Sequence, residues 1–161
     1  MTTAVLSIGS NLGDRLGHLQ SVVDGLPVLA VSPVYQTAPW GVTDQDDFLN
    51  AVLIVSHEDI DAWGWLEHAH VLEAAAGRVR DVHWGPRSLD VDVITVAGVT
   101  SADPKLVLPH PHAHERAFVL VPWLAVQPDA ELPGHGRVAD LAAALGDQGV
   151  RRREDLKLEA V

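Results

Sequence analysis

Residues 77–92 read Gly77-Arg78-Val79-Arg80-Asp81-Val82-His83-Trp84-Gly85-Pro86-Arg87-Ser88-Leu89-Asp90-Val91-Asp92. Three arginines precede an apolar run that carries two aspartates at positions i and i+2. Alternate side chains of a strand point to the same face, so Asp90 and Asp92 would share one face, about 7 Å apart along the strand. The stretch therefore predicts an arginine-rich loop that leads into a strand with a pair of carboxylates.

This combination of side chains suits a metal ion and a polyphosphate. Mg²⁺ is usually held by one or two carboxylates together with substrate phosphates. The guanidinium groups of Arg78, Arg80 and Arg87 can each bind phosphate oxygens in a bidentate manner. The alternative is a solvated loop with surface ion pairs. Because these arginines form a local positive patch in an acidic chain, we favour a specific small anion.

The composition of the chain narrows the classes of function. Its 161 residues suggest a single domain, 1–161, in which residues 146–161 form a charged, solvated tail. The net charge of −11 argues against nucleic-acid binding, which needs a basic surface. The absence of cysteine excludes disulfides and thiolate metal sites. We see no apolar run of roughly 20 residues and no basic leader, so we expect no membrane contact, a cytoplasmic location and a monomer.

The spacing of apolar residues predicts the remaining elements. Strands are expected at 3–8, 29–36, 48–55 and 89–96, with a further extended piece at 105–108. Helices are expected at 12–26, 60–76, 116–125 and 138–145, and Pro122 should kink or end the third of them. The order β-α-β-β-α-β matches the split βαβ plan. The predicted class is therefore α+β, a ferredoxin-like sandwich in which helices pack on one mainly antiparallel sheet.

Two other patterns leave alternatives open. Phe48 and Asn50 share one strand face, where they could stack a flat ring and bind its edge, or simply pack in the core. His110, His112 and His114 would suggest zinc, but the prolines between them favour a turn that enters a helix.

Taken together, the motifs closely resemble the 6-hydroxymethyl-7,8-dihydropterin pyrophosphokinase family. The matching segments run in the family's order: Gly9-Ser10-Asn11-Leu12-Gly13, Thr37-Ala38-Pro39, Phe48-Leu49-Asn50-Ala51, Gly77-Arg78-Val79-Arg80, Trp84-Gly85-Pro86-Arg87-Ser88-Leu89-Asp90-Val91-Asp92 and Pro109-His110. The resemblance implies an enzyme of folate biosynthesis. In that reaction the hydroxyl group of the pterin attacks the β-phosphorus of ATP, and AMP leaves.

The resemblance also implies a role for each matching residue. Asp90 and Asp92 would bind two Mg²⁺ ions, and the catalytic loop would contribute Arg78, Arg80, Trp84 and Arg87. ATP contacts are expected from His70, Glu73, Arg78, Arg80, Arg87, Lys105, His110 and Arg116. The pterin would lie between Phe48 and Phe118, with its polar edge against Thr37, Pro39, Trp40 and Asn50.

The chain departs from the family pattern at Ala38, Trp40, His70 and Pro111. Two other functions fit parts of the sequence. A metal-dependent phosphohydrolase or nucleotide-sugar transferase could use Asp90 and Asp92 with the three histidines, and a ferredoxin-like domain could merely bind a ligand. A hydrolase has no use for an aromatic pocket, and a binding module has no use for paired aspartates beside three arginines. We therefore prefer the pyrophosphokinase.

Overall fold

A computed structural model describes residues 2–38, 47–77 and 88–160 of the chain. The strands are β1 (Thr2–Ser10), β2 (Val28–Val31), β3 (Tyr35–Thr37), β4 (Phe48–His57), β5 (Asp90–Val96), β6 (Ser101–Asp103), β7 (Leu106–Leu108), β8 (Glu131–Leu132), β9 (Gly136–Arg137) and β10 (Arg151–Arg152). The helices are α1 (Arg15–Gly25), α2 (Ala62–Ala75), α3 (Ala117–Val126) and α4 (Val138–Leu145), and a 3-10 turn, η1 (Ala113–Glu115), precedes α3.

The main sheet has the order β10-β3-β4-β1-β5, and β2 also pairs with β4. Every pair in it is antiparallel. When β2 and β3 are counted together as one interrupted strand, this is the strand order of the ferredoxin-like plan. The predicted α+β class with one antiparallel sheet is thus confirmed. Two short hairpins, β6-β7 and β8-β9, form separate sheets.

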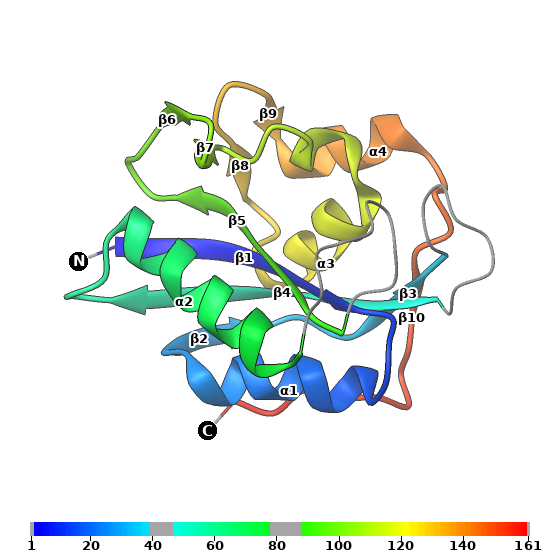
Figure 1. Cartoon of the computed structure of the whole chain (residues 1–161). Helices are drawn as coiled ribbons and strands as arrows, with labels where there is room; N and C mark the ends of the chain where they lie inside the picture. The colour runs from blue at the N-terminus through cyan, green and yellow to red at the C-terminus, as the bar shows by residue number, and fades with distance from the viewer. Residues whose placement is uncertain (1, 39–46, 78–87, 161) are drawn as a thin grey trace.

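Helices cover both faces of the sheet (Figure 1). Alternate residues of β1, such as Leu6 and Ile8, pack with α1 and α2 in one core. On the other face, Ile54 of β4 packs with Leu120 and Trp123 of α3, and α4 lies beside α3. The period-2 alternation of a strand therefore supplies two cores from the same residues, one on each side.

The first two helices begin at side-chain caps. The carboxylate of Asp14 accepts a hydrogen bond from the N–H of Gly17 at 3.0 Å, and Asp61 accepts one from Gly64 at 2.8 Å. Each bond satisfies one of the backbone donors that a helix leaves unpaired at its start. No helix in the described ranges is both long enough and apolar enough to cross a membrane.

Two local predictions were wrong, and so was part of a third. The strand expected at 29–36 is divided into β2 and β3, because Ser32 bonds the N–H of Val52 and the carbonyl of Pro33 where the ladder is interrupted. Of the two outcomes expected for Pro122, a kink or an end, the structure contradicts the end: α3 continues to Val126, since the surrounding residues are buried and their packing holds the helix. Residues 101–103, where no strand was predicted, pair with β7.

Most side chains of the C-terminal segment are exposed, and its backbone is nevertheless tied into the fold. Its strand β10 pairs with β3, and Leu156 and Leu158 pack against the core of α1 and α2. At its far end, the side-chain amide of Gln20 exchanges two hydrogen bonds with the backbone of Glu159, at 2.8 and 3.0 Å. The local sequence shows only the charges of this segment. The strand with which it pairs lies more than a hundred residues earlier, so the local sequence could not predict the pairing.

Candidate functional site

The sheet face that carries α3 changes from apolar to polar towards one end. On β5, Ile94 belongs to the core, whereas Asp92 and Asp90 line a pocket. On β4, Val52 and Ile54 belong to the same core, whereas Phe48 and Asn50, at the start of the strand, line the same pocket. The strand period therefore brings side chains from two strands together on one face, beyond the part that α3 covers.

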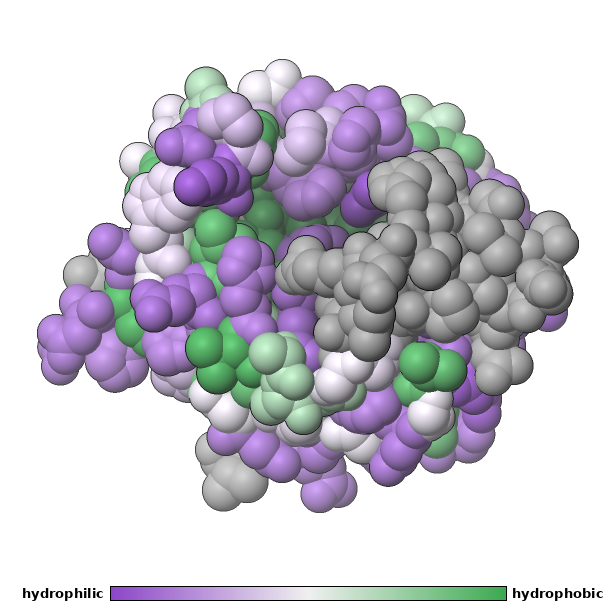
Figure 2. All heavy atoms as spheres, viewed as in Figure 1, coloured by the Kyte–Doolittle hydropathy of each residue, from purple (hydrophilic) through white to green (hydrophobic). Residues whose placement is uncertain are grey.

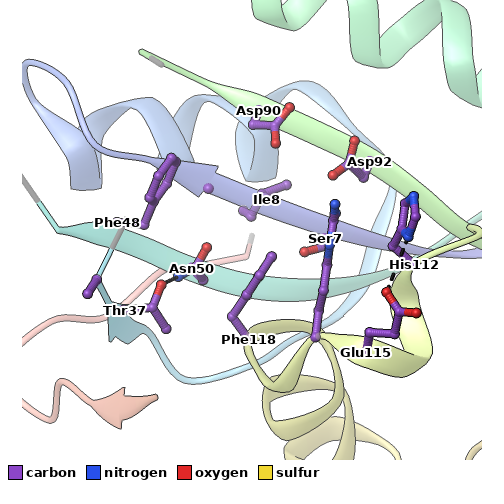
Figure 3. A pocket seen from close by; sticks show the side chains of 13 residues that line it. Ser7, Ile8, Thr37, Phe48, Asn50, Asp90, Asp92, His112, Glu115 and Phe118 are labelled. Atoms are coloured by element: carbon purple, nitrogen blue, oxygen red, sulfur yellow. Dashed lines mark hydrogen bonds and ion pairs between the residues drawn. The ribbon is translucent and has the colours of Figure 1, made fainter. Parts of the chain in front are cut away.

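The first pocket has a volume of about 330 Å³ and is lined by Ser7, Ile8, Gly9, Thr37, Ala38, Phe48, Asn50, Asp90, Asp92, His112, Glu115, Arg116 and Phe118. Figure 3 shows Phe48 of β4 and Phe118 of α3 at this pocket, together with Asn50 of β4 and its neighbour Thr37 of β3. The amide Nδ2 of the buried Asn50 donates to Thr37 Oγ1 at 2.6 Å. That bond orients the amide, so that Oδ1 can accept a hydrogen bond from a ligand.

Gly9 of β1 keeps this end of the pocket open. A Cβ atom at this position would lie 2.9 Å from Asn50 Oδ1 and 3.5 Å from Phe48 Cδ1. Any larger residue would therefore displace the amide that lines the pocket. A glycine within a strand is a recognised sign of close approach, and this is the signal that the sequence carries for Gly9.

The second pocket has a volume of about 350 Å³ and lies on the other side of the aspartates. Its lining residues are Leu66, His70, Glu73, Asp90, Val91, Asp92, Val93, Pro104, Lys105, Leu106, Val107, His110, Pro111 and Arg116. Asp90, Asp92 and Arg116 line both pockets. In the space-filling view, purple hydrophilic side chains surround a hollow on this side of the molecule (Figure 2).

The structure sorts the predicted contacts into two sets. The pterin contacts that it describes, Thr37, Phe48, Asn50 and Phe118, all line the first pocket. The ATP contacts that it describes, His70, Glu73, Lys105, His110 and Arg116, all line the second. Their roles stay predictions. Six further predicted residues, Pro39, Trp40, Arg78, Arg80, Trp84 and Arg87, lie outside the described residues.

Glu73 ties α2 to the strand of the aspartates. Its side chain is 2% exposed, and Oε2 accepts a hydrogen bond from the N–H of Val91 at 3.0 Å. Val91 lies between Asp90 and Asp92 in sequence. The buried carboxylate is therefore placed to fix the backbone from which both aspartates project.

His110 is held in its neutral form. Burial lowers the pKa of its imidazole to about 4, and the charges of Arg116 and His112 act in the same direction against a smaller opposing effect of Asp90. The backbone N–H of His112 donates to His110 Nδ1 at 3.2 Å. A neutral ring that accepts at Nδ1 carries its proton on Nε2, and this N–H is available as a donor in the second pocket.

The other two histidines of the run face Glu115. The distances are 3.3 Å from His112 Nδ1 to Glu115 Oε2 and 3.5 Å from His114 Nε2 to Glu115 Oε1. The ring of His114 stacks on that of His135, with 4.1 Å between centroids. No group of three or more His, Asp or Glu side chains within residues 2–38, 47–77 and 88–160 is arranged to hold a metal ion. The zinc alternative gains no support.

Asp90 and Asp92 nevertheless fit Mg²⁺ bound together with a nucleotide. They provide two half-buried carboxylates at the junction of the two pockets. Mg²⁺ normally takes one or two protein carboxylates and fills its remaining positions with phosphate oxygens and water. A pair of aspartates is the donor set expected for such an ion.

Known proteins are similar to this chain over nearly its full length. The family model described as 7,8-dihydro-6-hydroxymethylpterin-pyrophosphokinase matches residues 5–128. The 2-amino-4-hydroxy-6-hydroxymethyldihydropteridine pyrophosphokinase of Mycobacterium leprae is 52% identical over 170 residues, which cover 98% of this chain and 89% of that protein. The Mycobacterium tuberculosis protein of the same name is 46% identical over 169 residues, covering 98% and 90%.

A solved structure supports the fold. The HPPK-DHPS protein of Plasmodium falciparum, in complex with pteroate, superimposes with a TM-score of 0.67 at 11% identity. The match covers 89% of this chain and 44% of the other, so this chain spans less than half of that protein.

Proposed function

The chain belongs to the 7,8-dihydro-6-hydroxymethylpterin-pyrophosphokinase family, and we propose that it carries out the reaction of that family in folate biosynthesis. Pyrophosphate would pass from ATP to the hydroxymethyl group of 6-hydroxymethyl-7,8-dihydropterin, giving the pterin diphosphate and AMP. One observation of the structure carries this proposal: two pockets of opposite character meet at Asp90 and Asp92. Joining a flat ring to part of a triphosphate requires both.

The pterin would occupy the first pocket. The rings of Phe48 and Phe118 would sandwich it, and Asn50 Oδ1 would accept from an N–H group at its edge. By family resemblance, Pro39 and Trp40 would complete this wall. The pocket volume of about 330 Å³ lies in the usual range for small-molecule sites.

ATP would occupy the second pocket. Lys105 and Arg116 supply positive charge, and His110 supplies a neutral donor. By family resemblance, His70 would add a further contact, and Arg78, Arg80, Trp84 and Arg87 would surround the triphosphate. Arginine forks suit phosphate oxygens, and excluding water prevents hydrolysis of ATP. Glu73 would act mainly through the strand that it holds.

The chemical step needs positioning more than covalent catalysis. The hydroxyl oxygen of the pterin would attack the β-phosphorus while the bond from that phosphorus to the oxygen of AMP breaks. We place Mg²⁺, in the form of two ions, at Asp90 and Asp92. A bound divalent cation there would lower the pKa of the attacking hydroxyl and neutralise charge on the phosphates.

We further propose that residues 1–161 act as one domain and as a monomer. The integration of the C-terminal segment into the main sheet supports a single folding unit. Because ATP is a co-substrate, we place the reaction in the cytoplasm.

The test is to incubate the protein with ATP, Mg²⁺ and the reduced pterin alcohol, and to separate the nucleotides. We expect AMP and pterin diphosphate in equal amounts, and no AMP when the pterin is omitted. ADP as the product would contradict pyrophosphoryl transfer. Hydrolysis of ATP in the absence of pterin would favour the phosphohydrolase built on Asp90 and Asp92.

A further inference from the structure

The segment after α4 reaches two walls of the first pocket. Figure 1 shows it, in orange and red, descending from α4 past β3 and ending beneath α1. The family model ends at residue 128, so this segment lies beyond the matched region. We call residues 148–153 the C-terminal clamp.

One end of the clamp bonds to the wall that carries Phe118. Gln148 Oε1 accepts from the N–H of Ala117 at 3.0 Å, and Gln148 Nε2 donates to the carbonyl of Glu115 at 3.2 Å. The two bonded backbone groups lie on either side of Arg116 in sequence, and Phe118 is the residue after Ala117. The residue at the start of α3, Arg116, makes no side-chain capping bond of its own. Gln148 therefore satisfies a helix-start donor that would otherwise rely on water.

The other end bonds to the wall that carries Thr37. In β10, Arg151 pairs with Gln36 and Arg152 with Tyr35. Strand β3 has only three residues, and without β10 it would be the edge of the sheet. Since Thr37 ends β3 and accepts the bond that orients Asn50, the position of the recognition amide depends on this strand.

Arg153 extends the same contact through its side chain. Its N–H donates to the carbonyl of Val34 at 2.8 Å, and Nη1 donates to Gln36 Oε1 at 2.6 Å. Gln36 Nε2 in turn donates to Asp47 Oδ2 at 2.7 Å. Asp47 is the residue before Phe48 in sequence. Two bonds from Arg153 to Asp155, at 2.9 and 2.8 Å, hold the guanidinium in place.

From these contacts we infer that the C-terminal clamp holds the Phe118 wall and the Thr37 wall at the spacing that the pterin ring requires. It thereby sets the affinity for the pterin more strongly than that for ATP, because its hydrogen bonds come near the second pocket at Arg116. Within the described residues, none of the clamp's hydrogen bonds reaches α2, β5 or β7, which form most of the second pocket. The inference rests on the proposed function in one respect, the identity of the ligand.

The far end of the segment has its own anchors, so the clamp can be altered without releasing it. Leu156 and Leu158 pack on the core, and Glu159 bonds to Gln20. Suitable variants of the full chain are Gln148→Ala, Arg153→Ala and the double variant. Arg151→Ala is the matched control, because this exposed arginine lies in the same segment, keeps its backbone pairing with Gln36 as alanine, and has no side-chain hydrogen bond or ion pair among the described residues.

The experiment measures binding of the pterin, and separately of an ATP analogue with Mg²⁺, by calorimetry. Each single variant should weaken pterin binding roughly threefold to tenfold, the effect of losing one or two hydrogen bonds. ATP-analogue binding should change less than about twofold in Arg153→Ala, and clearly less than pterin binding in Gln148→Ala, whose lost bonds flank Arg116. Hydrogen exchange should become faster in β3 and at the start of α3 in the double variant, and stay unchanged in β1.

Equal pterin affinity in the double variant and in Arg151→Ala would overturn the inference. So would a parallel loss of both affinities together with a lower melting temperature, which would mean a merely structural role. Assays of the unaltered chain distinguish a failure of the clamp inference from a failure of the proposed function. If it binds both ligands but forms no AMP, the function fails and the clamp is still tested. A chain that binds no pterin refutes both.

Discussion

The two pockets are nearly equal in volume, about 330 and 350 Å³, yet they differ in how they are built. The first lies on a face of the sheet and is walled by two aromatic rings and a buried amide. The second curves around β5, so that Asp90 and Val91, which point to opposite faces, both line it. This is possible because β5 is an edge strand of the sheet.

The difference explains why the aspartates lie on β5. A carboxylate on an interior strand could serve only the pocket on its own face, whereas one on an edge strand can be reached from the face and from the side. Asp90 and Asp92 can therefore act on a ring-shaped ligand and a phosphate ligand at once. Changes at the junction should impair the joint reaction, and changes within one pocket should impair one ligand alone.

The largest effect is expected at the junction, from Asp92→Ala. Loss of one carboxylate weakens the Mg²⁺ site, and turnover should fall by about a thousandfold, while pterin binding should change only a few-fold. Steady-state kinetics and calorimetry measure the two quantities. Asp59→Ala removes an exposed carboxylate in a turn and serves as the control. Activity of Asp92→Ala near that of the control would refute the metal assignment.

A change confined to the first pocket is Gly9→Ala. The new methyl group would meet Asn50 Oδ1 at 2.9 Å, so the amide must move. Pterin affinity should fall roughly tenfold to a hundredfold, and overpacking should lower the free energy of unfolding by about 1–3 kcal/mol. Affinity for ATP should be unaffected.

The control for Gly9→Ala adds the same methyl group elsewhere. In Gly25→Ala, at the end of α1, the nearest neighbour would be a flexible methyl group, Leu72 Cδ2, at 3.0 Å. If both variants bind the pterin like the unaltered chain, Gly9 does not shape the pocket. If Gly9→Ala loses ATP affinity to the same degree, the two pockets are not independent.

Glu73 allows the second pocket to be separated from the strand that supports it. Glu73→Ala leaves the N–H of Val91 without its buried partner and should lower the free energy of unfolding by about 1–3 kcal/mol. Glu73→Gln keeps an acceptor and should retain most of the stability and the turnover. A Glu73→Gln variant with normal stability but a strongly raised KM for ATP would instead show direct contact with the nucleotide.

Local periodicity accounts for what the sequence could predict. The alternation of a strand placed Asp90 with Asp92 and Phe48 with Asn50, and each pair does line the first pocket. Features that depend on distant partners could not be obtained in this way. The role of Gly9 requires the register of β1 with β4, and the contacts of Gln148 require the position of α3.

The C-terminal segment shows why charge can mislead. Arg151, Arg152 and Arg153 are followed by two acids, a composition typical of solvated ends. Their backbone nevertheless completes the sheet, because β3 offers an open edge and Leu156 and Leu158 anchor the continuation. Neither feature is visible in the local sequence.

The smallest effect is expected from the protonation of His110. Burial lowers its pKa to about 4 from an ordinary value of 6.5, so the unfolded chain takes up a proton between these pH values that the native chain does not. The contribution of His110 to stability is therefore complete above pH 6.5 and decreases as the pH falls towards 4. Urea unfolding measures this effect: between pH 6.5 and pH 4 the free energy of unfolding should decrease less for His110→Asn than for the unaltered chain. His68→Asn, at an exposed histidine, is the control.

The same shift bears on how the second pocket holds phosphate. If His110 stays neutral, it contributes a single N–H and no charge, and the attraction for ATP comes from Lys105, Arg116 and the metal. The KM for ATP should then not decrease as the pH is lowered from 8 to 6, either in the unaltered chain or in His110→Asn. A decrease that occurs in the unaltered chain and is absent in His110→Asn would contradict this expectation. Such a decrease would mean that the triphosphate restores the proton, and that the second pocket binds by charge at this position too.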